Sequence, residues 1–179
     1  GRGGSMHLTD LDVGFVGSTA IVSNSIPVGV GLSLSSKILD KKQITIIYLG
    51  DASVEEGTFF ESLNFAIVKK IPVIFICENN FYSVYSPLSV RQPINRKIHK
   101  MVRGCDIKSY KANGNFTNEV ISCFLKAKNF VEKKRKPIFL EFQTYRWFEH
   151  CGPNLDDHLK YRNKKELMYW KKNDPIDIL

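Results

Sequence analysis

The chain has 179 residues, 43% hydrophobic and 12% aromatic, so it is long enough to form one domain with a sizeable core. No apolar run approaches the length that crosses a bilayer and no secretory signal pattern is present, which argues against a membrane protein. The net charge of +8 invites a nucleic-acid partner, but the charge is spread along the chain. Its densest run, 133–136, lies where a helix is expected to end, so we expect a solvated helix terminus and no nucleic-acid partner. The basic surface could also help to dock acidic partner domains.

The four cysteines, Cys77, Cys105, Cys123 and Cys151, form no CxxC pair. Cys77 lies in an expected buried strand and Cys123 on the apolar face of an expected helix, so both are interpreted as structural thiols. This usage is typical of a reducing compartment, and a cytoplasmic location is expected.

The first part of the chain predicts a loop followed by a helix. Residues 1–26 are rich in glycine, serine and aspartate and have little periodicity, which predicts a loop that crosses a sheet edge. A helix is expected from Pro27 to about Leu39, begun by proline. Small residues lower its intrinsic propensity: Gly29, Gly31 and Ser33. Tight packing must therefore hold this helix in place.

A strand–helix–strand unit follows. Residues 43–49 and 72–77 are apolar runs that predict buried strands, and residues 55–70 predict the helix between them. One face of this helix is apolar at the expected spacing: Phe59, Leu63, Ala66 and Ile67. Such a unit places the two strands parallel and side by side.

The remaining segments continue the alternation of strands and helices. In chain order we expect a long surface loop with about one helical turn (81–106), a strand (106–112), a helix with Val120, Phe124, Ala127 and Val131 on one face (117–133), a strand (137–145) and a helix ended by Asn173-Asp174-Pro175 (166–172). The pattern predicts an α/β fold with a doubly wound, mostly parallel sheet. His99 and His158 have no partner motif and are expected on the surface.

A carboxylate and an amide side chain follow the first two expected strands. Asp51, in the turn 50–53, closes the first strand, and Asn80 follows the second strand 29 positions later. The carboxyl ends of neighbouring parallel strands meet at one edge of a sheet, where such sheets bind ligands. Both side chains carry oxygen atoms suited to a hard cation. A Gly-Asp pair alone is ordinarily only a turn, but the matched Asn79-Asn80 favours a cation site.

The spacing and the flanking residues resemble the thiamine-diphosphate motif. More narrowly, they resemble the α subunit of the 2-oxo acid dehydrogenase E1 family, which includes the pyruvate, branched-chain and acetoin dehydrogenases. The matching pieces cover nearly the whole chain: Gly3-Gly4-Ser5-Met6-His7, Ile21-Val22, Pro27, Glu56-Gly57 with Glu61 and Asn64, Glu78-Asn79-Asn80 with Tyr82, and Thr144-Tyr145-Arg146. The resemblance implies the thiamine-diphosphate-binding fold. Because the family's domain extends beyond both ends, residues 1–179 are expected to be a single truncated domain, a fragment of a longer subunit.

The resemblance also implies how the cofactor and its metal are held. Magnesium would be bound by the carboxylate of Asp51, the amide oxygen of Asn80 and the backbone carbonyl of Tyr82. The diphosphate would lie against the backbone N–H groups of the turn at Gly50, Ala52 and Ser53. Most relatives have glycine where this chain has Ala52. The added methyl would crowd the diphosphate if the backbone there requires a positive φ.

The N-terminal motif carries further implied roles. His7 would lie near the reactive end of the cofactor as a proton donor or substrate-orienting group, because imidazole titrates near neutrality. Backbone groups of Ala20 and Val22 would hold the aminopyrimidine ring. Residues 1–5 alone could equally be a vector-derived sequence before a native Met6, although the full motif favours a native origin.

The segment after the last expected strand supplies the remaining implied residues. In the family an arginine and a histidine of this loop approach the diphosphate, and Arg146 and His150 match their positions. His150 is in addition a candidate catalytic residue.

This loop also departs from the family. Many relatives have His-Gly-His-Ser where this chain has Phe148-Glu149-His150-Cys151, so the first histidine is absent. Cys151 replaces a serine that is phosphorylated in some relatives, and that regulation is not expected here. Glu149 and Arg146 could alternatively form an ordinary surface ion pair.

The implied function is that of a thiamine-diphosphate- and Mg²⁺-dependent oxidoreductase. It would decarboxylate a 2-oxo acid, or cleave an acetoin-like ketone, and pass the acyl group to a lipoyl carrier protein. The expected partner is an E1 β subunit, in an α2β2 heterotetramer or a homologous dimer, because that subunit supplies the carboxylate that activates the cofactor. Two alternatives stay open. One is a transketolase-like or synthase-type transferase acting on a sugar or specialised metabolite, favoured by the unusual loop 147–153; the other is a non-catalytic subunit that retains the fold.

Overall fold

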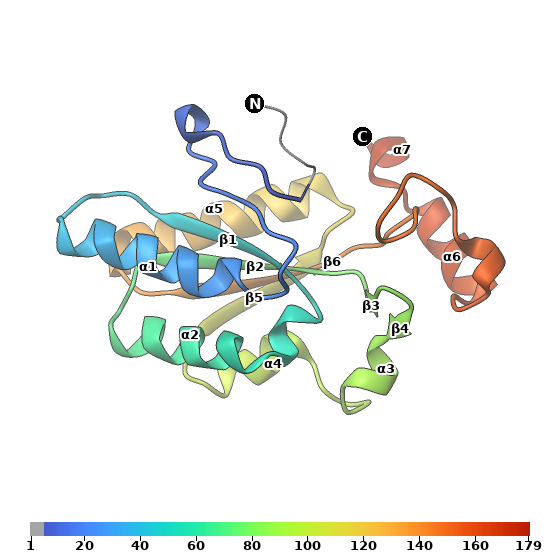
Figure 1. Cartoon of the computed structure of the whole chain (residues 1–179), viewed down its shortest axis with the longest axis horizontal. Helices are drawn as coiled ribbons and strands as arrows, with labels where there is room; N and C mark the ends of the chain where they lie inside the picture. The colour runs from blue at the N-terminus through green and yellow to red at the C-terminus, as the bar shows by residue number, and fades with distance from the viewer. Residues whose placement is uncertain (1–5) are drawn as a thin grey trace.

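A parallel sheet of four strands forms the centre of the molecule. The computed structural model describes residues 6–179. In spatial order the strands are β1 (Thr45–Gly50), β2 (Val73–Asn79), β6 (Ile138–Gln143) and β5 (Lys108–Asn113), and every neighbouring pair is parallel. Helices pack on both faces of the sheet (Figure 1). The predicted doubly wound α/β architecture is therefore confirmed.

Three helices cover the first face: α1 (Ser25–Ile38), α2 (Gly57–Val68) and α4 (Ile98–Arg103). Apolar residues of the sheet pack against these helices, and Phe75 and Phe139 among them are fully excluded from solvent. Phe59 of α2 meets Phe139 edge to face, with the ring centroids 6.1 Å apart. On α2, Phe59, Leu63 and Ala66 are fully buried, as the sequence pattern predicts.

The second face is covered by α5 (Thr117–Lys134). Its buried residues are Cys123, Ala127 and Val131, which pack against a sheet surface that includes Ile74 and Leu140. This confirms the expected position of the helix. Val120 and Phe124 lie at the margin of the same contact and are only partly buried.

Helix α1 depends on close packing. A Cβ atom on Gly29 would lie 2.5 Å from Cγ1 of Ile47, so only glycine lets this helix approach β1 so closely. Ser33 is fully buried and its hydroxyl donates to the carbonyl of Pro72 at 3.0 Å. Around Gly31 there is open space within 4 Å. The expectation that packing holds this helix is thus confirmed at two of its three small residues.

The segment 81–106 contains more structure than the single turn expected. Two short strands, β3 (Tyr82–Ser83) and β4 (Ser86–Pro87), pair antiparallel, and α3 (Leu88–Arg91) follows them before α4. The N–H of Leu88 donates to the carbonyl of Phe81 at 2.8 Å. These elements are too short to show a period in the sequence, which explains why the pattern predicted a loop.

The remaining elements are short turns and helices, most of them near the two ends of the chain. Before α1 the described residues form a loop with one 3₁₀ turn, η1 (Leu11–Val13), and a second such turn, η2 (Ser53–Glu55), precedes α2. After β6 come η3 (Asp157–Leu159), α6 (Lys164–Lys172) and α7 (Pro175–Ile178). The predicted helix at 166–172 is confirmed, and α6 ends at the C-cap Asn173. Asp174 then caps α7, because its side chain accepts from the N–H of Ile176 at 2.8 Å.

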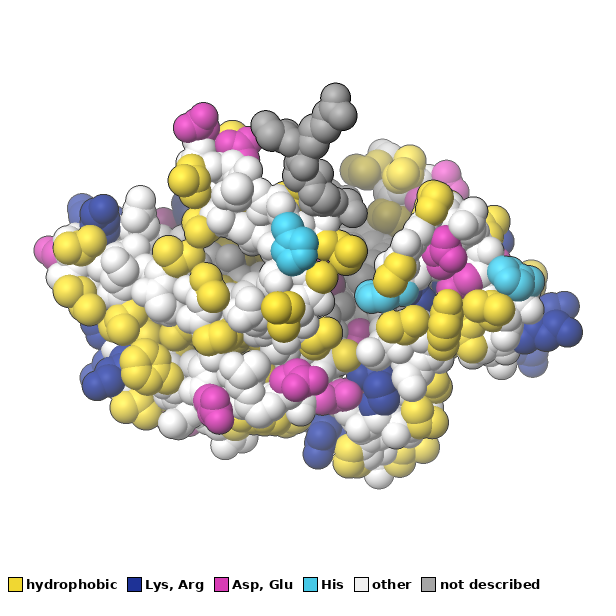
Figure 2. All heavy atoms as spheres, in the orientation of Figure 1, with side chains coloured by type: hydrophobic (Ala, Val, Ile, Leu, Met, Phe, Trp, Pro, Cys, Tyr) yellow, Lys and Arg dark blue, Asp and Glu magenta, His cyan; other side chains and the backbone are white. Residues whose placement is uncertain are grey.

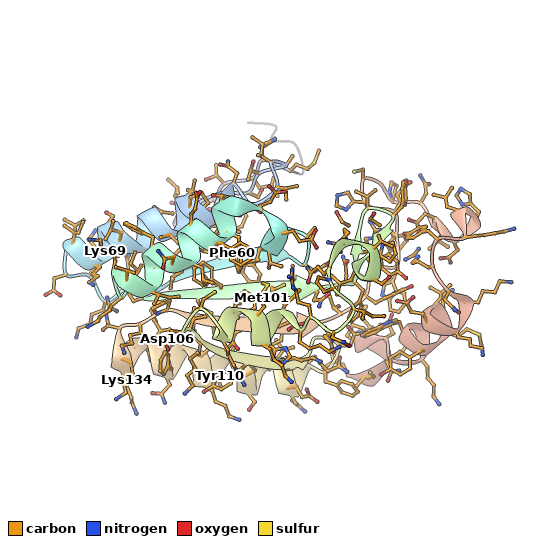
Figure 3. The ribbon with its side chains drawn as sticks, turned by 90° about the horizontal axis from the view of Figure 1, so that it is seen from below. Phe60, Lys69, Met101, Asp106, Tyr110 and Lys134 are labelled. Carbon is orange, nitrogen blue, oxygen red and sulfur yellow. The ribbon has the colours of Figure 1, made fainter. Side chains whose placement is uncertain are left out.

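Basic residues gather where the helices end. In Figure 3, Lys69 at the end of α2 and Lys134 at the end of α5 lie at the end of the molecule far from α6. Lys37 of α1 donates to the carbonyls of Lys69 and Lys70, which directly follow α2. The basic run 133–136 is therefore a helix terminus, as predicted.

Two further observations concern the class of protein. Among residues 6–179, no helix is both long enough and apolar enough to cross a membrane. The four cysteines all lie in this range and none forms a disulfide. Cys77 and Cys123 are buried, as expected for structural thiols, whereas Cys105 and Cys151 are exposed.

Candidate functional site

The carboxyl edge of the sheet brings Asp51 and Asn80 together. Gly50 of β1 lies opposite Glu78 of β2 in the parallel register, so the residues that follow each strand are neighbours in space. Asp51 is 2% exposed. Burial raises its pKa above the ordinary value, while the Arg91 guanidinium and the backbone N–H groups of Asp51 and Asn80 act in the opposite direction. A carboxylate buried at this position stays ionised only where a positively charged partner offsets its desolvation.

Arg91 is that partner, and the sequence did not predict it. Its guanidinium forms an ion pair with Asp51 through Nη2 and with Glu55 through Nη1, the latter at 2.5 Å. Gln92 donates to the same oxygen of Glu55 at 2.8 Å. Arg91 is 40 positions from Asp51 along the chain and belongs to a segment without a period, so no pattern in the sequence indicated the pairing.

The turn that carries Asp51 has an ordinary backbone. Ala52 has φ −73° and ψ −27°, in the right-handed helical region. Alanine adopts this conformation without strain. The concern that a glycine is required at position 52 for a positive φ is therefore removed. Asp51 and Ala52 lead directly into η2, so the N–H groups of Ala52 and Ser53 belong to a helical turn.

The two asparagines after β2 each close a tight turn. Asn79 Oδ1 accepts from the N–H of Phe81 and Asn80 Oδ1 from the N–H of Tyr82, both at 3.0 Å. Asn79 is also tied to β6, because its Nδ2 donates to Glu141 at 2.9 Å. The amide oxygen of Asn80 has two lone pairs, so one remains for a further partner such as a cation. Tyr82, the third residue of the expected metal set, lies directly on this turn.

The N-terminal residues lie in an exposed loop. His7, Ala20 and Val22 are all exposed, and the His7 side chain makes no hydrogen bond within the described part of the chain. Buried Ser23 ties the loop to the edge, since its hydroxyl donates to the carbonyl of Ser53 at 2.9 Å. This bond places residues 20–23 beside the turn of Asp51. Residues 3–5, the Gly-Gly-Ser part of the predicted Gly-Gly-Ser-Met-His motif, lie outside the described residues.

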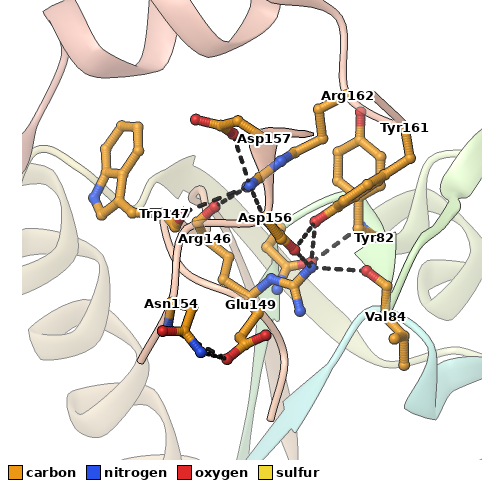
Figure 4. Close-up of polar contacts among 11 residues, drawn as sticks. Tyr82, Val84, Arg146, Trp147, Glu149, Asn154, Asp156, Asp157, Tyr161 and Arg162 are labelled. Carbon is orange, nitrogen blue, oxygen red and sulfur yellow. Dashed lines mark hydrogen bonds and ion pairs between the residues drawn. The ribbon is translucent and has the colours of Figure 1, made fainter. Parts of the chain in front are cut away.

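The guanidinium of Arg146 has buried nitrogen atoms without a hydrogen-bond partner among the described residues. Its Nη2 donates to the carbonyl of Val84 at 2.7 Å and to the hydroxyl of Tyr161 at 2.8 Å, and it lies 3.8 Å from Asp156 (Figure 4). Nε and Nη1 of the same side chain are buried and have no partner among the described residues. Buried donors normally have a partner, so this guanidinium is suited to an anion.

Glu149 and His150 lie in the loop that follows. Glu149 accepts from Nδ2 of Asn154 at 2.8 Å, and its N–H donates to the carbonyl of the same residue at 2.9 Å (Figure 4). The alternative that Glu149 and Arg146 form a surface ion pair is therefore wrong, because both have other partners. His150 is exposed at the tip of this closed loop.

A buried charged cluster lies behind Arg146, and the sequence did not predict it either. Arg162 forms ion pairs with Asp156 and with Asp157, the latter at 3.0 Å. Its guanidinium carbon lies 5.0 Å from the ring centroid of Tyr161 and 5.5 Å from that of Tyr145. Aromatic rings surround the cluster: Tyr82, Tyr85, Tyr145, Trp147 and Trp170. The only available signal was a Tyr-Arg pair, 161–162, that repeats the pair 145–146.

One histidine prediction is wrong. His99 was expected on the surface, but only 14% of its side chain is exposed, and Nδ1 lies 2.8 Å from Glu141. Glu141 is 3% exposed and also accepts from the backbone N–H of His99 at 2.9 Å. A buried carboxylate on a central strand needs such donors, which draws His99 inward. His158 is exposed, as expected.

Comparisons with known proteins match the whole chain to one family. The family model described as "Dehydrogenase E1 component" matches residues 1–179. The pyruvate dehydrogenase E1 component subunit alpha of Rickettsia bellii is 35% identical over 176 residues, which are 98% of this chain and 53% of the relative. The testis-specific mitochondrial form of that subunit from Rattus norvegicus is 33% identical over 180 aligned positions, covering 100% of this chain and 44% of the relative.

The fold is shared with a more distant solved structure. A transketolase from Campylobacter jejuni superposes with a TM-score of 0.61 at 17% identity, covering 71% of this chain and 20% of the transketolase. At this identity the likeness concerns the fold alone. The chain spans about half the length of the curated relatives it matches.

Proposed function

Because the chain belongs to the dehydrogenase E1 component family, we propose that it acts as the α-type part of a thiamine-diphosphate- and Mg²⁺-dependent 2-oxo acid dehydrogenase. The reaction is the decarboxylation of a 2-oxo acid, with transfer of the acyl group to a lipoyl carrier protein. The observation that carries this proposal is the convergence of Asp51 and Asn80 at the carboxyl edge of the sheet. We propose residues 1–179 as a single cofactor-binding domain of a longer subunit.

The residues present fit a magnesium diphosphate. Asp51 supplies a carboxylate oxygen, Asn80 an amide oxygen with a spare lone pair, and the Tyr82 carbonyl a third ligand. Such a set, completed by phosphate oxygens, needs no group of three acidic or histidine side chains, and none occurs in residues 6–179. The buried, partnerless Nε and Nη1 of Arg146 fit a phosphate oxygen. The N–H groups at Gly50, Ala52 and Ser53 add neutral donors.

The chain's own residues would bind and orient the reactants. When bound, the cofactor supplies a carbon nucleophile and an electron sink for the 2-oxo acid. His7 and His150, both exposed in loops, would hold or donate a proton at the substrate oxygen. Ala20 and Val22 hold the cofactor ring through backbone groups, next to the Ser23–Ser53 hydrogen bond.

An exposed apolar surface supports the proposed partner. Figure 2 shows hydrophobic side chains gathered over the outer sides of α1 and α2. They include Val28, Leu32, Phe60 and Phe65, each at least 36% exposed. Surfaces of this kind commonly mark protein–protein contacts. We propose that the E1 β subunit covers it, in an α2β2 heterotetramer or a homologous dimer. The four free thiols support a cytoplasmic location.

Calorimetric titration of thiamine diphosphate and Mg²⁺ into the full-length subunit with its β partner tests the proposal. The wild type is expected to bind saturably and only with magnesium, and Asp51→Ala to lose binding. Asp177→Ala is the matched control, since it removes an exposed carboxylate on α7. Binding that survives in Asp51→Ala would contradict the assigned metal ligand. Absence of binding in the wild type would instead favour a non-catalytic subunit.

A transferase function is the second candidate. The observation that favours it is the loop 147–153, which departs from the family pattern and is held by the hydrogen bond from Asn154 to Glu149. A transferase acting on a sugar or specialised metabolite would bind the same cofactor. Lipoyl-dependent acyl transfer in the presence of the β partner distinguishes the two, because only the dehydrogenase requires the carrier.

A further inference from the structure

Arg91 forms an ion pair with Asp51, the carboxylate that is proposed to bind the metal. Its Nη2 bonds Oδ2 of Asp51, its Nη1 bonds Glu55 at 2.5 Å, and its Nε donates to the carbonyl of Ser86 at 3.2 Å. Its side chain is 11% exposed. Figure 2 shows acidic and basic side chains side by side between the start of α2 and α3. The resemblance to the dehydrogenase family assigned no role to this residue.

The charge balance at this edge depends on Arg91. Asp51 and Glu55 contribute two negative charges and the guanidinium one positive charge, so a divalent cation meets only one net negative charge. At the partly buried edge these charges interact strongly, because solvent screens them little. Moreover, Oδ2 of Asp51 is already used as a hydrogen-bond acceptor. A cation alone therefore competes with Arg91 for Asp51.

A diphosphate changes this competition. Guanidinium groups bind phosphate oxygens through two parallel hydrogen bonds, as well as they bind carboxylates. A diphosphate at the same sheet edge thus offers Arg91 a new partner. Transfer of the guanidinium to the phosphate frees Asp51 for the cation.

We propose that Arg91 couples cation binding to diphosphate binding at this edge. It weakens the site for a divalent cation while the diphosphate is absent and contributes a bond to the diphosphate once it is present. The proposal rests on the proposed function. Coupling of this kind is reciprocal, so each ligand raises the affinity for the other by the same factor. Removing Arg91 must reduce that factor.

Binding of Mn²⁺, followed by its paramagnetic resonance signal, measures the effect without any turnover. The full-length subunit with its β partner is titrated with Mn²⁺ in the absence of diphosphate. Arg91→Met is expected to bind Mn²⁺ about tenfold more tightly than the wild type. Calorimetry at saturating Mg²⁺ is expected to show thiamine diphosphate binding about tenfold more weakly to the same variant.

Arg96→Met is the matched control. Arg96 lies in the loop before α4 and forms no ion pair in the described part of the chain, so both affinities are expected to stay unchanged. If Arg91→Met does not fold, Arg91→Lys replaces it. A lysine cannot bond both carboxylates through a fixed fork, so it is expected to shift both affinities in the same directions by less.

The outcomes separate the two proposals. Unchanged Mn²⁺ affinity in the Arg91 variants, with normal cofactor binding by the wild type, overturns the coupling and leaves the proposed function intact. Tighter Mn²⁺ binding together with tighter cofactor binding also overturns it, because Arg91 would then only oppose the cation. If the wild type binds neither ligand, the proposed function itself fails.

Discussion

The sheet interior and the segment after β6 are held together by different physics. Within the sheet, Ile74, Phe75 and Phe139 are fully buried and belong to the apolar clusters on its two faces. In the segment 144–172 the buried side chains include Arg162 and Asp156, packed between aromatic rings. Apolar burial stabilises in proportion to the area removed from water. A buried ion pair is stable only while every charged member keeps its partner.

The largest effect is expected in the sheet. Phe139→Ala removes a fully buried ring that meets Phe59 edge to face, which leaves a cavity between α2 and β6. The free energy of unfolding is expected to fall by about 4 kcal/mol. Urea unfolding followed by far-ultraviolet circular dichroism measures this. A loss below about 1 kcal/mol would mean that the sheet interior is not the main source of stability.

The charged cluster provides the second test. Asp156→Asn keeps the shape of the side chain but leaves Arg162 and Arg146 short of a negative partner. About 3 kcal/mol of stability is expected to be lost. Hydrogen exchange should locate the loss in residues 144–172 and leave the sheet protected.

The matched control for this change is Glu132→Gln. Glu132 forms an exposed pair with Lys128 at 3.4 Å on α5, with about half of each side chain exposed. Its removal is expected to change stability by less than about 0.5 kcal/mol. Equal losses from the two carboxylates would mean that burial does not distinguish the two regions.

Two glycines of α1 sharpen the comparison at smaller scale. Gly29→Ala forces a methyl against Ile47 at 2.5 Å, so a loss of about 1–2 kcal/mol is expected. Gly31→Ala meets open space and is expected to stabilise by up to about 1 kcal/mol through helix propensity. Thermal unfolding of the two variants should give shifts of opposite sign. Shifts of the same sign would refute the close contact between α1 and β1.

The smallest effect is expected from a tyrosine in the polar region. Burial, with the nearby Glu166 carboxylate, raises the pKa of Tyr145 from 10.0 to about 12. Between these values the unfolded chain has lost the phenolic proton and the folded chain retains it. The folded state binds more protons there, so stability falls as the pH rises through this window. Tyr145→Phe should flatten this loss and remove one late step from the tyrosinate absorbance titration.

The same contrast explains what the sequence could predict. The strands and main helices follow from local periodicity, and the meeting of Asp51 and Asn80 follows from parallel pairing of neighbouring strands. The partners Arg91 and His99 were missed because they reach across 40 and 42 positions from short helices without a period. The lack of strain at Ala52 depends on its φ, which no residue pattern specifies.

The two edges of the sheet differ in a way that affects handling of the protein. β5 carries Lys108 and Lys111, whereas β1 has the sequence Thr-Ile-Ile-Tyr-Leu-Gly, without charge or proline, and pairs only with β2 among the described residues. On β1, Ile46 is 39% and Tyr48 58% exposed. An uncharged edge strand is a template for pairing with another chain. The protein is therefore expected to aggregate through β1, and Ile46→Lys is the substitution to make first to keep it in solution.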